Sequence, residues 1–272
     1  MGAIAKPAAG TAQWYAALRS PSTPTLRELR VQAYGVGEYV GQEGFMTATE
    51  MLALARAAGV GRGTCVLDLC CGSGEPGLYL VQETGCHLVG LDLCEPGLRK
   101  AQRRAASAWL VGSAHFLVAD ATRLPLGTQF DVVLLLETAL AFQDKPRLLR
   151  GIGRLLRPKG RLALTVEEGF PLSNEERRGV PGGDGIWLVE YRPFLALIES
   201  LGFRVKHCED RTRAHADLAS QLARSFRQHR DRLAAELGAA MCEDLVAAHI
   251  RWAEWLTTRR VRKLALIAEH TG

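Results

Sequence analysis

The stretch VLDLCCGSGEPG, Val66 to Gly77, decides the fold that the rest of the chain completes. The stretch begins with the end of an apolar run. Gly72, Gly74 and Gly77 follow in the pattern G-x-G-x-x-G. A glycine-rich turn between a strand and a helix lets a ligand approach free backbone N–H groups, as in nucleotide sites. The spacing alone is a weak signal, because a tight turn can use glycine for geometry only.

Asp68, at the end of the apolar run, separates two classes of ligand. A carboxylate beside the glycines would repel the pyrophosphate of a dinucleotide at close range and would attract a cation. The glycine pattern by itself supports a nicotinamide oxidoreductase, and Asp68 opposes that interpretation. S-adenosylmethionine carries an ammonium and a sulfonium group, so an acid followed by glycine-rich backbone suits it.

Short apolar runs alternate with helical patterns from Thr64 onward, which predicts an α/β fold. We expect a Rossmann-like, doubly wound and mostly parallel sheet of seven strands. The first five predicted strands are TCVLDL (64–69), CHLVGLD (86–92), HFLVAD (115–120), FDVVLLLE (130–137) and GRLALTVE (160–167). A sixth lies within YRPFLALIESLGFRVKHC, after a helix, and VRKLALIAEH closes the chain as the last strand.

The chain of 272 residues is predicted to be a single domain with additions at two places. Cap helices are expected within residues 1–60, at 13–18, 25–34 and 50–60, followed by a cofactor-binding core over 64–209. Two long amphipathic helices over 212–258 form a lid insert before the final strand at 260–270. The Gly- and Pro-rich connection from Gly169 to Trp187 is longer than compact folds normally tolerate, so it is either mobile or a working loop.

Composition bounds the partners and the compartment. A net charge of +5 from 34 basic and 29 acidic side chains is mixed in sign and does not demand nucleic acid. Seven cysteines without a C-x-x-C pair predict no metal site and favour a reduced, cytoplasmic setting. No run approaches the roughly 20 apolar residues that span a bilayer, so no membrane insertion is expected. The oligomeric state is left open.

The run LDLCCGSG (67–74) resembles motif I of the class I S-adenosylmethionine-dependent methyltransferases, and the resemblance extends in order over most of 64–204. It implies S-adenosyl-L-methionine as the cofactor. The residues that it assigns to cofactor binding are Asp68, Gly72 and Gly74 beside the methionine part, Asp92 with Leu93 at the ribose, and Asp120 with Ala121 at the adenine. Asp92 and Asp120 also have a simpler interpretation, as exposed acids that cap the next turn.

The segment YVGQEGFMTATEML (39–52) resembles the cap of the small-molecule branch of this superfamily, with Tyr39 as a candidate contact to the cofactor carboxylate. The insert resembles the helices that cover the acceptor there. We therefore expect methyl transfer to a small molecule, such as a natural-product intermediate of secondary metabolism. A nucleic-acid methyltransferase is disfavoured because the fourth strand ends in LLET, without an Asp-Pro-Pro-Tyr type motif or a following Pro-Cys.

A general base is harder to place. Many relatives carry a histidine soon after the fourth-strand acid, whereas this chain continues Glu137-Thr-Ala-Leu-Ala-Phe. Glu137 is the first candidate for a catalytic base, because the carboxyl end of a central strand faces the ligand crevice. Further candidates are Glu167 and Glu168, and on the insert His215, His229 and His249. The missing histidine keeps open a relative that binds the cofactor without methylating, for instance a cyclase or a binding protein.

Overall fold

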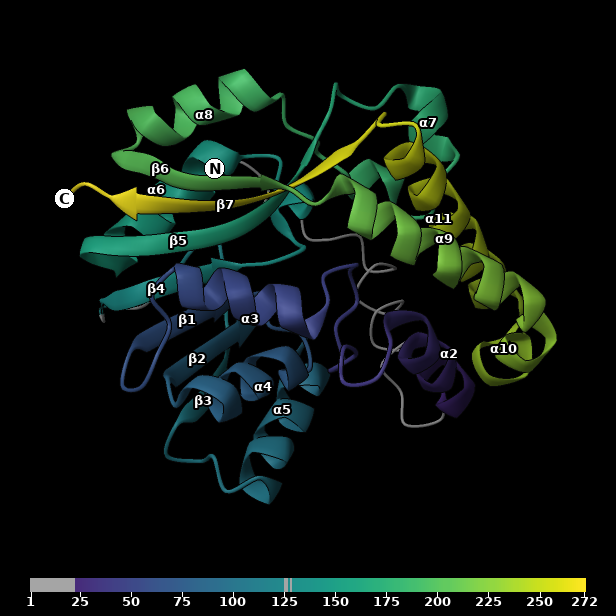
Figure 1. The fold of residues 1–272 in the computed structure, drawn as a ribbon, viewed down its shortest axis with the longest axis horizontal. Coiled ribbons are helices and arrows are strands. Elements are labelled where there is room, and N and C mark those ends of the chain that lie inside the picture. Colours follow the sequence, from purple (N-terminus) through teal and green to yellow (C-terminus); the bar gives the residue numbers. More distant parts are fainter. Residues whose placement is uncertain (1–22, 125–126, 128) are drawn as a thin grey trace.

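The computed structural model describes residues 23–124, 127 and 129–272, and one sheet runs through them (Figure 1). Its seven strands have the order β3-β2-β1-β4-β5-β7-β6. Their bounds are β1 (Cys65–Leu69), β2 (His87–Asp92), β3 (Ala114–Val118), β4 (Phe130–Leu135), β5 (Leu156–Glu168), β6 (Phe203–Asp210) and β7 (Arg262–His270). Neighbouring strands from β3 to β5 pair in parallel, and β7 is antiparallel to both β5 and β6. The predicted doubly wound, mostly parallel sheet is confirmed.

Helices cover both faces of this sheet. On one face α3 (Ala48–Ala57), α4 (Glu75–Thr84) and α5 (Glu95–Ser107) share an apolar core with alternate strand residues such as Val66 and Leu88. On the other face α6 (Lys145–Leu155) and α8 (Tyr191–Ser200) pack on Leu67, Leu69 and their neighbours. Successive strand residues point to opposite faces, so strands that are apolar throughout require two helical layers.

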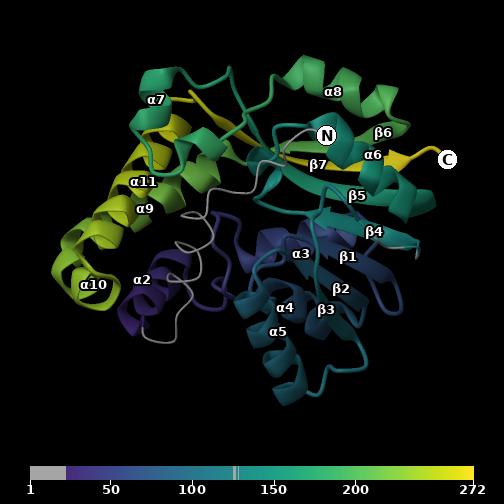
Figure 2. The same ribbon diagram turned by 180° about the vertical axis from the view of Figure 1, so that it is seen from behind.

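A separate lobe stands at the carboxyl edge of the sheet. It contains α2 (Pro24–Tyr34) and the insert helices α9 (Thr212–Gln228), α10 (Arg230–Leu237) and α11 (Ala239–Thr257). Both views place α2 beside the insert helices, away from the helices that cover the sheet (Figures 1 and 2). The lobe has its own apolar core, distinct from the two cores of the sheet.

Two sequence predictions differ from these elements, and a third is untested. The insert has three helices and not two, because α9 ends at Gln228, with His229 between it and α10, and Gly238, with φ of 82°, separates α10 from α11. Strand β5 begins at Leu156, which pairs with Phe130, and residues 157–160 form a bulge before Arg161 pairs with Val132. The helix predicted at 13–18 lies outside the described residues.

The long connection after β5 contains local structure. Helix α7 (Asn174–Arg178) starts with a capping box in which Ser173 and Glu176 bond each other's backbone N–H groups. The Arg260 guanidinium bonds both oxygens of the Glu176 carboxylate, at 2.6 and 2.9 Å. These contacts tie the connection to the turn that leads into β7. Across the described helices, none is both long enough and apolar enough to cross a membrane.

Candidate active site

The glycine loop follows β1 at the carboxyl edge of the sheet, and its glycines are required by geometry. Gly72 and Gly74 have φ of 59° and 73°, in the left-handed region that favours glycine. A Cβ on Gly74 would lie 2.6 Å from the Ala101 methyl, and a Cβ on Gly77 would lie 2.8 Å from Leu88. The loop thus turns sharply while α4 packs closely on β2, which leaves backbone N–H groups at the helix start facing the edge.

Asp68 is a buried carboxylate without a partner. Its residue is 9% exposed, and it makes no hydrogen bond or ion pair to the residues that the structure describes. Burial, and then the charge of Asp92, raise the pKa of Asp68 to about 7. A buried carboxylate is costly unless a cation or donors compensate it, so this position fits an ammonium-bearing ligand.

Asp92, at the end of β2, holds the glycine loop in place through hydrogen bonds to backbone N–H groups. One carboxylate oxygen accepts a hydrogen bond from Gly72 N at 2.8 Å, and the other accepts one from Cys94 N at 2.7 Å. An ionised carboxylate offers about four lone-pair sites, so two remain for a vicinal diol. The side chain of the adjacent Leu93 is 53% exposed, which leaves an apolar surface beside Asp92.

Asp120 follows β3 and closes a local turn. Its Oδ1 accepts hydrogen bonds from the backbone N and the hydroxyl of Thr122, both at 2.8 Å, while Ala121 is buried. The turn-capping interpretation therefore describes Asp120 in this structure, and its second oxygen remains for a ligand. The carboxyl edge thus brings together the acids that end three adjacent strands.

The segment from 35 to 47 lies across this edge between α2 and α3. A Cβ on Gly41 would lie 2.7 Å from Glu75 Cβ, and a Cβ on Gly44 would lie 2.6 Å from Glu137 Cγ. Tyr39 lies in this cap segment, half-buried, and its hydroxyl accepts a hydrogen bond from the buried Arg30 at 3.3 Å. The absence of a side chain at Gly41 lets the cap segment pack closely on the start of α4. The absence of one at Gly44 lets the same segment pack closely on the end of β4.

Glu137 lies at the end of β4 within a buried charge cluster. Its carboxylate is 3.0 Å from the Lys263 ammonium and accepts a hydrogen bond from Phe45 N at 2.9 Å. Lys263 also pairs with Glu167, which is 1% exposed. Burial alone would raise the pKa of Glu137, but Lys263, His215 and the Phe45 N–H lower it to about 2. Burial and the Glu137 charge raise the pKa of Glu167 against the opposing effect of Lys263.

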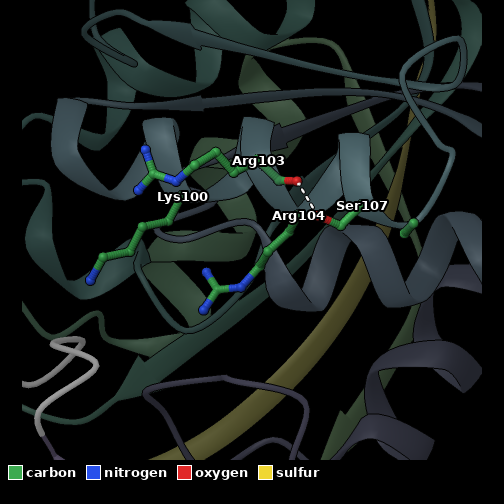
Figure 3. Close-up of a pocket in the computed structure, with 5 residues that line it drawn as sticks. Lys100, Arg103, Arg104 and Ser107 are labelled. Atoms are coloured by element: carbon green, nitrogen blue, oxygen red, sulfur yellow. Dashed lines mark hydrogen bonds between the residues drawn. The ribbon is translucent and has the colours of Figure 1, made fainter.

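A shallow basic hollow lies along α5 beside the glycine loop, where Arg104 donates a hydrogen bond to Ser73 O at 3.2 Å. Figure 3 shows Lys100, Arg103 and Arg104 around it, with Ser107 donating to the Arg103 carbonyl oxygen at 3.0 Å. It is lined by this one helix and contains none of the strand-end acids.

The comparisons with known proteins agree with this geometry. Residues 66–160 match the family model described as a methyltransferase domain. Over these residues the chain is similar to methyltransferase domains, in agreement with the resemblance of LDLCCGSG to motif I of the class I S-adenosylmethionine-dependent methyltransferases. The chain is 36% identical to the 27-O-demethylrifamycin SV methyltransferase of Amycolatopsis mediterranei over 103 aligned residues. This alignment covers 38% of each of the two chains. The first three curated relatives are matched over 37 to 38% of their own length.

Two solved structures share the fold of this chain. Phosphoethanolamine N-methyltransferase 2 of Haemonchus contortus, in complex with phosphomonomethylethanolamine and S-adenosylhomocysteine, aligns with a TM-score of 0.75 at 19% identity. That alignment covers 95% of this chain and 61% of the other. The cyclase SpnF aligns with a TM-score of 0.74 at 20% identity, over 96% and 94% of the two chains.

The contacts of Glu137 do not suit the predicted role of a base. A carboxylate with a pKa of about 2 binds a proton weakly at neutral pH, and its oxygens face Lys263 and Phe45 N. The same contacts suit a structural role, because they fix the cap segment to the end of β4. Glu168, a further candidate, pairs with Arg262 at 2.7 Å.

The three insert histidines have different surroundings. His229 is at the α9–α10 junction, where its Nδ1 is 3.0 Å from Ser225 O. His249 is buried against Phe45 and Phe226, and burial lowers its pKa to about 4. His215 is 1% exposed and pairs through Nε2 with Glu50 at 3.3 Å.

Lys263, Glu50 and Phe45 are central to this edge and were missed by the sequence reasoning. Lys263 directly precedes the apolar run LALIA within β7. This was a usable signal, because a buried lysine beside such a run needs a partner for its charge. Glu50 stands three residues after Thr47, and this spacing indicates a capping box. The spacing gives no information about the contact between Glu50 and His215.

Proposed function

We propose that this chain transfers a methyl group from S-adenosyl-L-methionine to a small-molecule acceptor. When bound, this cofactor supplies an electrophilic methyl group on a positively charged sulfur. The single observation that carries the proposal is the buried, unpartnered carboxylate of Asp68 beside the glycine loop. A bound ammonium would compensate that charge, whereas a diphosphate would add to the repulsion.

The remaining cofactor contacts follow from the strand ends. Asp92 has lone pairs left for both ribose hydroxyls, and the exposed face of Leu93 offers an apolar surface to the adenine. Asp120 and Ala121 would contact the edge of the adenine ring. Tyr39 and the N–H groups of the glycine loop would face the carboxylate of the cofactor. Gly72 and Gly74 allow the backbone to approach.

The acceptor would enter between the cap segment and the insert lobe. Phe45 packs edge-on against His249 and Trp252, with ring centroids 6.0 and 6.5 Å apart, so the surface that would meet the acceptor there is apolar and aromatic. Such a wall suits a natural-product intermediate of secondary metabolism. The protein's contribution to rate would be mainly alignment, which supplies on the order of 7 to 11 kcal/mol in favourable systems.

We also infer a cytoplasmic location and no nucleic-acid partner. All seven cysteines are free, as expected in a reducing compartment. The basic and acidic side chains are mixed, and the basic hollow on α5 carries Glu75 within 3.1 Å of Arg104. A methyl transfer to a small acceptor that is insensitive to salt would support this inference.

The proposal is tested by calorimetric titration with S-adenosylmethionine, S-adenosylhomocysteine and NAD. We expect both adenosyl ligands to bind and NAD to give no signal. The Asp92→Ala variant should weaken binding by roughly tenfold or more, since one hydrogen bond to a charged group contributes about 1.5 to 3 kcal/mol. Asp217→Ala, on the exposed side of α9, is the matched control. Tight NAD binding without an adenosyl response would refute the proposal.

Methyl transfer itself is tested with labelled cofactor, 27-O-demethylrifamycin SV and phosphomonomethylethanolamine, followed by mass analysis of the product. A second candidate function is a cofactor-binding protein that does not methylate. The similarity to the cyclase SpnF over 96% of this chain favours it. Adenosyl-ligand binding without label in any acceptor would support that candidate.

A further inference from the structure

One imidazole nitrogen at the carboxyl edge is buried and unpaired. His215 lies one turn into α9, which begins directly after β6. The residue is 1% exposed, and its Nδ1 has no hydrogen-bond partner among the described residues. A buried polar atom without a partner is costly and is uncommon in folded proteins, so it points to a missing ligand group.

The other nitrogen of the ring is held by the cap. His215 Nε2 is 3.3 Å from Glu50 Oε2, and Glu50 also caps α3 by accepting a hydrogen bond from Thr47 N at 3.0 Å. Burial would raise the pKa of Glu50, but His215, Thr47 and Arg211 together lower it, so the carboxylate stays ionised. An ionised carboxylate at Nε2 favours the tautomer with the proton on Nε2, which leaves a lone pair on Nδ1.

The ring is close to the reacting edge. When it is protonated, the imidazole is near enough to Glu137, at the end of β4, to lower the pKa of that carboxyl. Its centroid is 6.5 Å from the ring of Phe45, whose backbone N–H bonds Glu137. His215 therefore borders both the end of β4 and the aromatic wall where the acceptor would lie.

Charged groups from each neighbouring element lie around the Glu50–His215 pair. Glu50 comes from α3 and contacts the imidazole, Arg211 precedes α9, Glu137 follows β4, and Lys263 is the second residue of β7. Arg211 is 3.5 Å from the Glu50 carboxylate, and Lys263 neutralises Glu137 at 3.0 Å. Glu50 and Glu137 thus each have a fixed cation. Glu167 Oε2 is also buried without a hydrogen-bond partner, but the other oxygen of that carboxylate pairs with Lys263, whereas His215 Nδ1 is the unpaired acceptor that borders Phe45.

We propose that His215 is the catalytic base of this methyltransferase and that Glu50 is the residue that positions it. The proposal rests on the proposed function. An acceptor hydroxyl would donate its hydrogen to Nδ1. As its oxygen forms the new bond to the methyl carbon, the carbon–sulfur bond breaks, its electron pair stays on sulfur, and the acceptor proton moves to Nδ1. The resulting imidazolium is stabilised by the Glu50 carboxylate at Nε2.

His249 and Glu137 are less suited to the same step. His249 is buried among aromatic rings, and its low pKa of about 4 makes it a weak base. Glu137 faces Lys263 and the Phe45 N–H. His215 combines a buried lone pair with a carboxylate that favours its protonated form, as a general base requires.

The first experiment measures kcat against pH for wild type, His215→Ala and Glu50→Gln, with 27-O-demethylrifamycin SV as the first hydroxyl acceptor. We expect His215→Ala to lower kcat by about 10²- to 10⁴-fold, with partial rescue by added imidazole. Glutamine also completes a capping box, so Glu50→Gln should keep α3 intact while it moves the acid limb of the kcat profile to lower pH. His207→Ala, on the exposed part of β6, is the matched control.

The S-adenosylhomocysteine affinity of each variant separates folding from chemistry. Unchanged affinity with a lower kcat and imidazole rescue would support the proposal. Unchanged kcat in His215→Ala would overturn it while leaving the proposed function in place. Absence of methyl transfer in the wild type would count against the proposed function instead.

A second readout needs no acceptor. Nitrogen NMR of histidine-labelled protein distinguishes a ring nitrogen that carries a proton from one that does not. We expect a bare Nδ1 and a protonated Nε2 on His215 at about pH 8, with this preference lost in Glu50→Gln. A proton on Nδ1 in the wild type at that pH would overturn the proposal whatever the activity.

Discussion

Asp68 combines burial and charge, which a proton or a cationic ligand can compensate. Its pKa of about 7 follows from burial and from the charge of Asp92. A cation binds the ionised carboxylate, so binding and protonation compete at this residue.

We expect the affinity for S-adenosylhomocysteine to depend on this competition. Above about pH 7.5 the dissociation constant should be constant, and below about pH 7 it should rise by up to about tenfold per pH unit, because the carboxyl must first lose its proton. Calorimetry between about pH 5.5 and pH 8.5 measures this. Asp68→Asn should bind more weakly with no such dependence, and a flat wild-type curve would contradict the prediction.

Lys263 compensates two buried carboxylates, and its removal should destabilise the fold. Lys263→Met leaves Glu137 and Glu167 unpaired, which we expect to lower the free energy of unfolding by about 3 to 5 kcal/mol at pH 8. The loss should be smaller near pH 5, where carboxyls with raised pKa values bind protons. Urea unfolding measures it. Lys206→Met on the surface should change stability by less than about 0.5 kcal/mol, and equal effects of the two substitutions would count against this explanation.

At the scale of elements, the cap segment between α2 and α3 closes the carboxyl edge. Gly44 presses on Glu137 and bonds the Tyr34 hydroxyl through its carbonyl oxygen, while Gly41 presses on Glu75. Any side chain at these two positions must push the segment away from the strand ends.

Gly44→Ala should therefore loosen the cap without unfolding the sheet. We expect faster hydrogen exchange over residues 38–46 and roughly tenfold faster dissociation of S-adenosylhomocysteine, because affinity changes within one site appear mainly in the off-rate. Stopped-flow competition measures the rate. Gly61→Ala, where a Cβ meets nothing within 4 Å, is the control. An unchanged off-rate would show that the cap does not retain the ligand.

At the scale of the whole molecule, the cap and the insert form one lobe with a core of its own. Residues of α2, Phe45, the long connection and the insert helices pack together. Glu236 of α10 also accepts a hydrogen bond from Thr25 N at 2.9 Å, which joins the cap to the insert. The strands of the sheet belong to two other clusters.

We expect this lobe to open as a unit, at a lower free energy than the sheet. Native-state hydrogen exchange should show α2, α9 and α11 exchanging together and before β1 and β4, and S-adenosylhomocysteine should slow them together. Exchange of α2 independently of the insert would contradict this coupling.

The sequence by itself determined the alternation of strands and helices, the glycine loop, and the acids that end β1, β2 and β3. These features are local, since each rests on a period of two or 3.6 residues or on one turn, and parallel strands then bring their carboxyl ends to one edge. Only the tertiary structure decided which charges meet there. Glu50 and His215 are 165 residues apart, and Glu167 and Lys263 are 96 apart. Such pairs depend on how the cap and insert pack on the sheet, and no local pattern contains that information. The sequence therefore made Glu137 the first candidate for a catalytic base and could not show its buried partner Lys263.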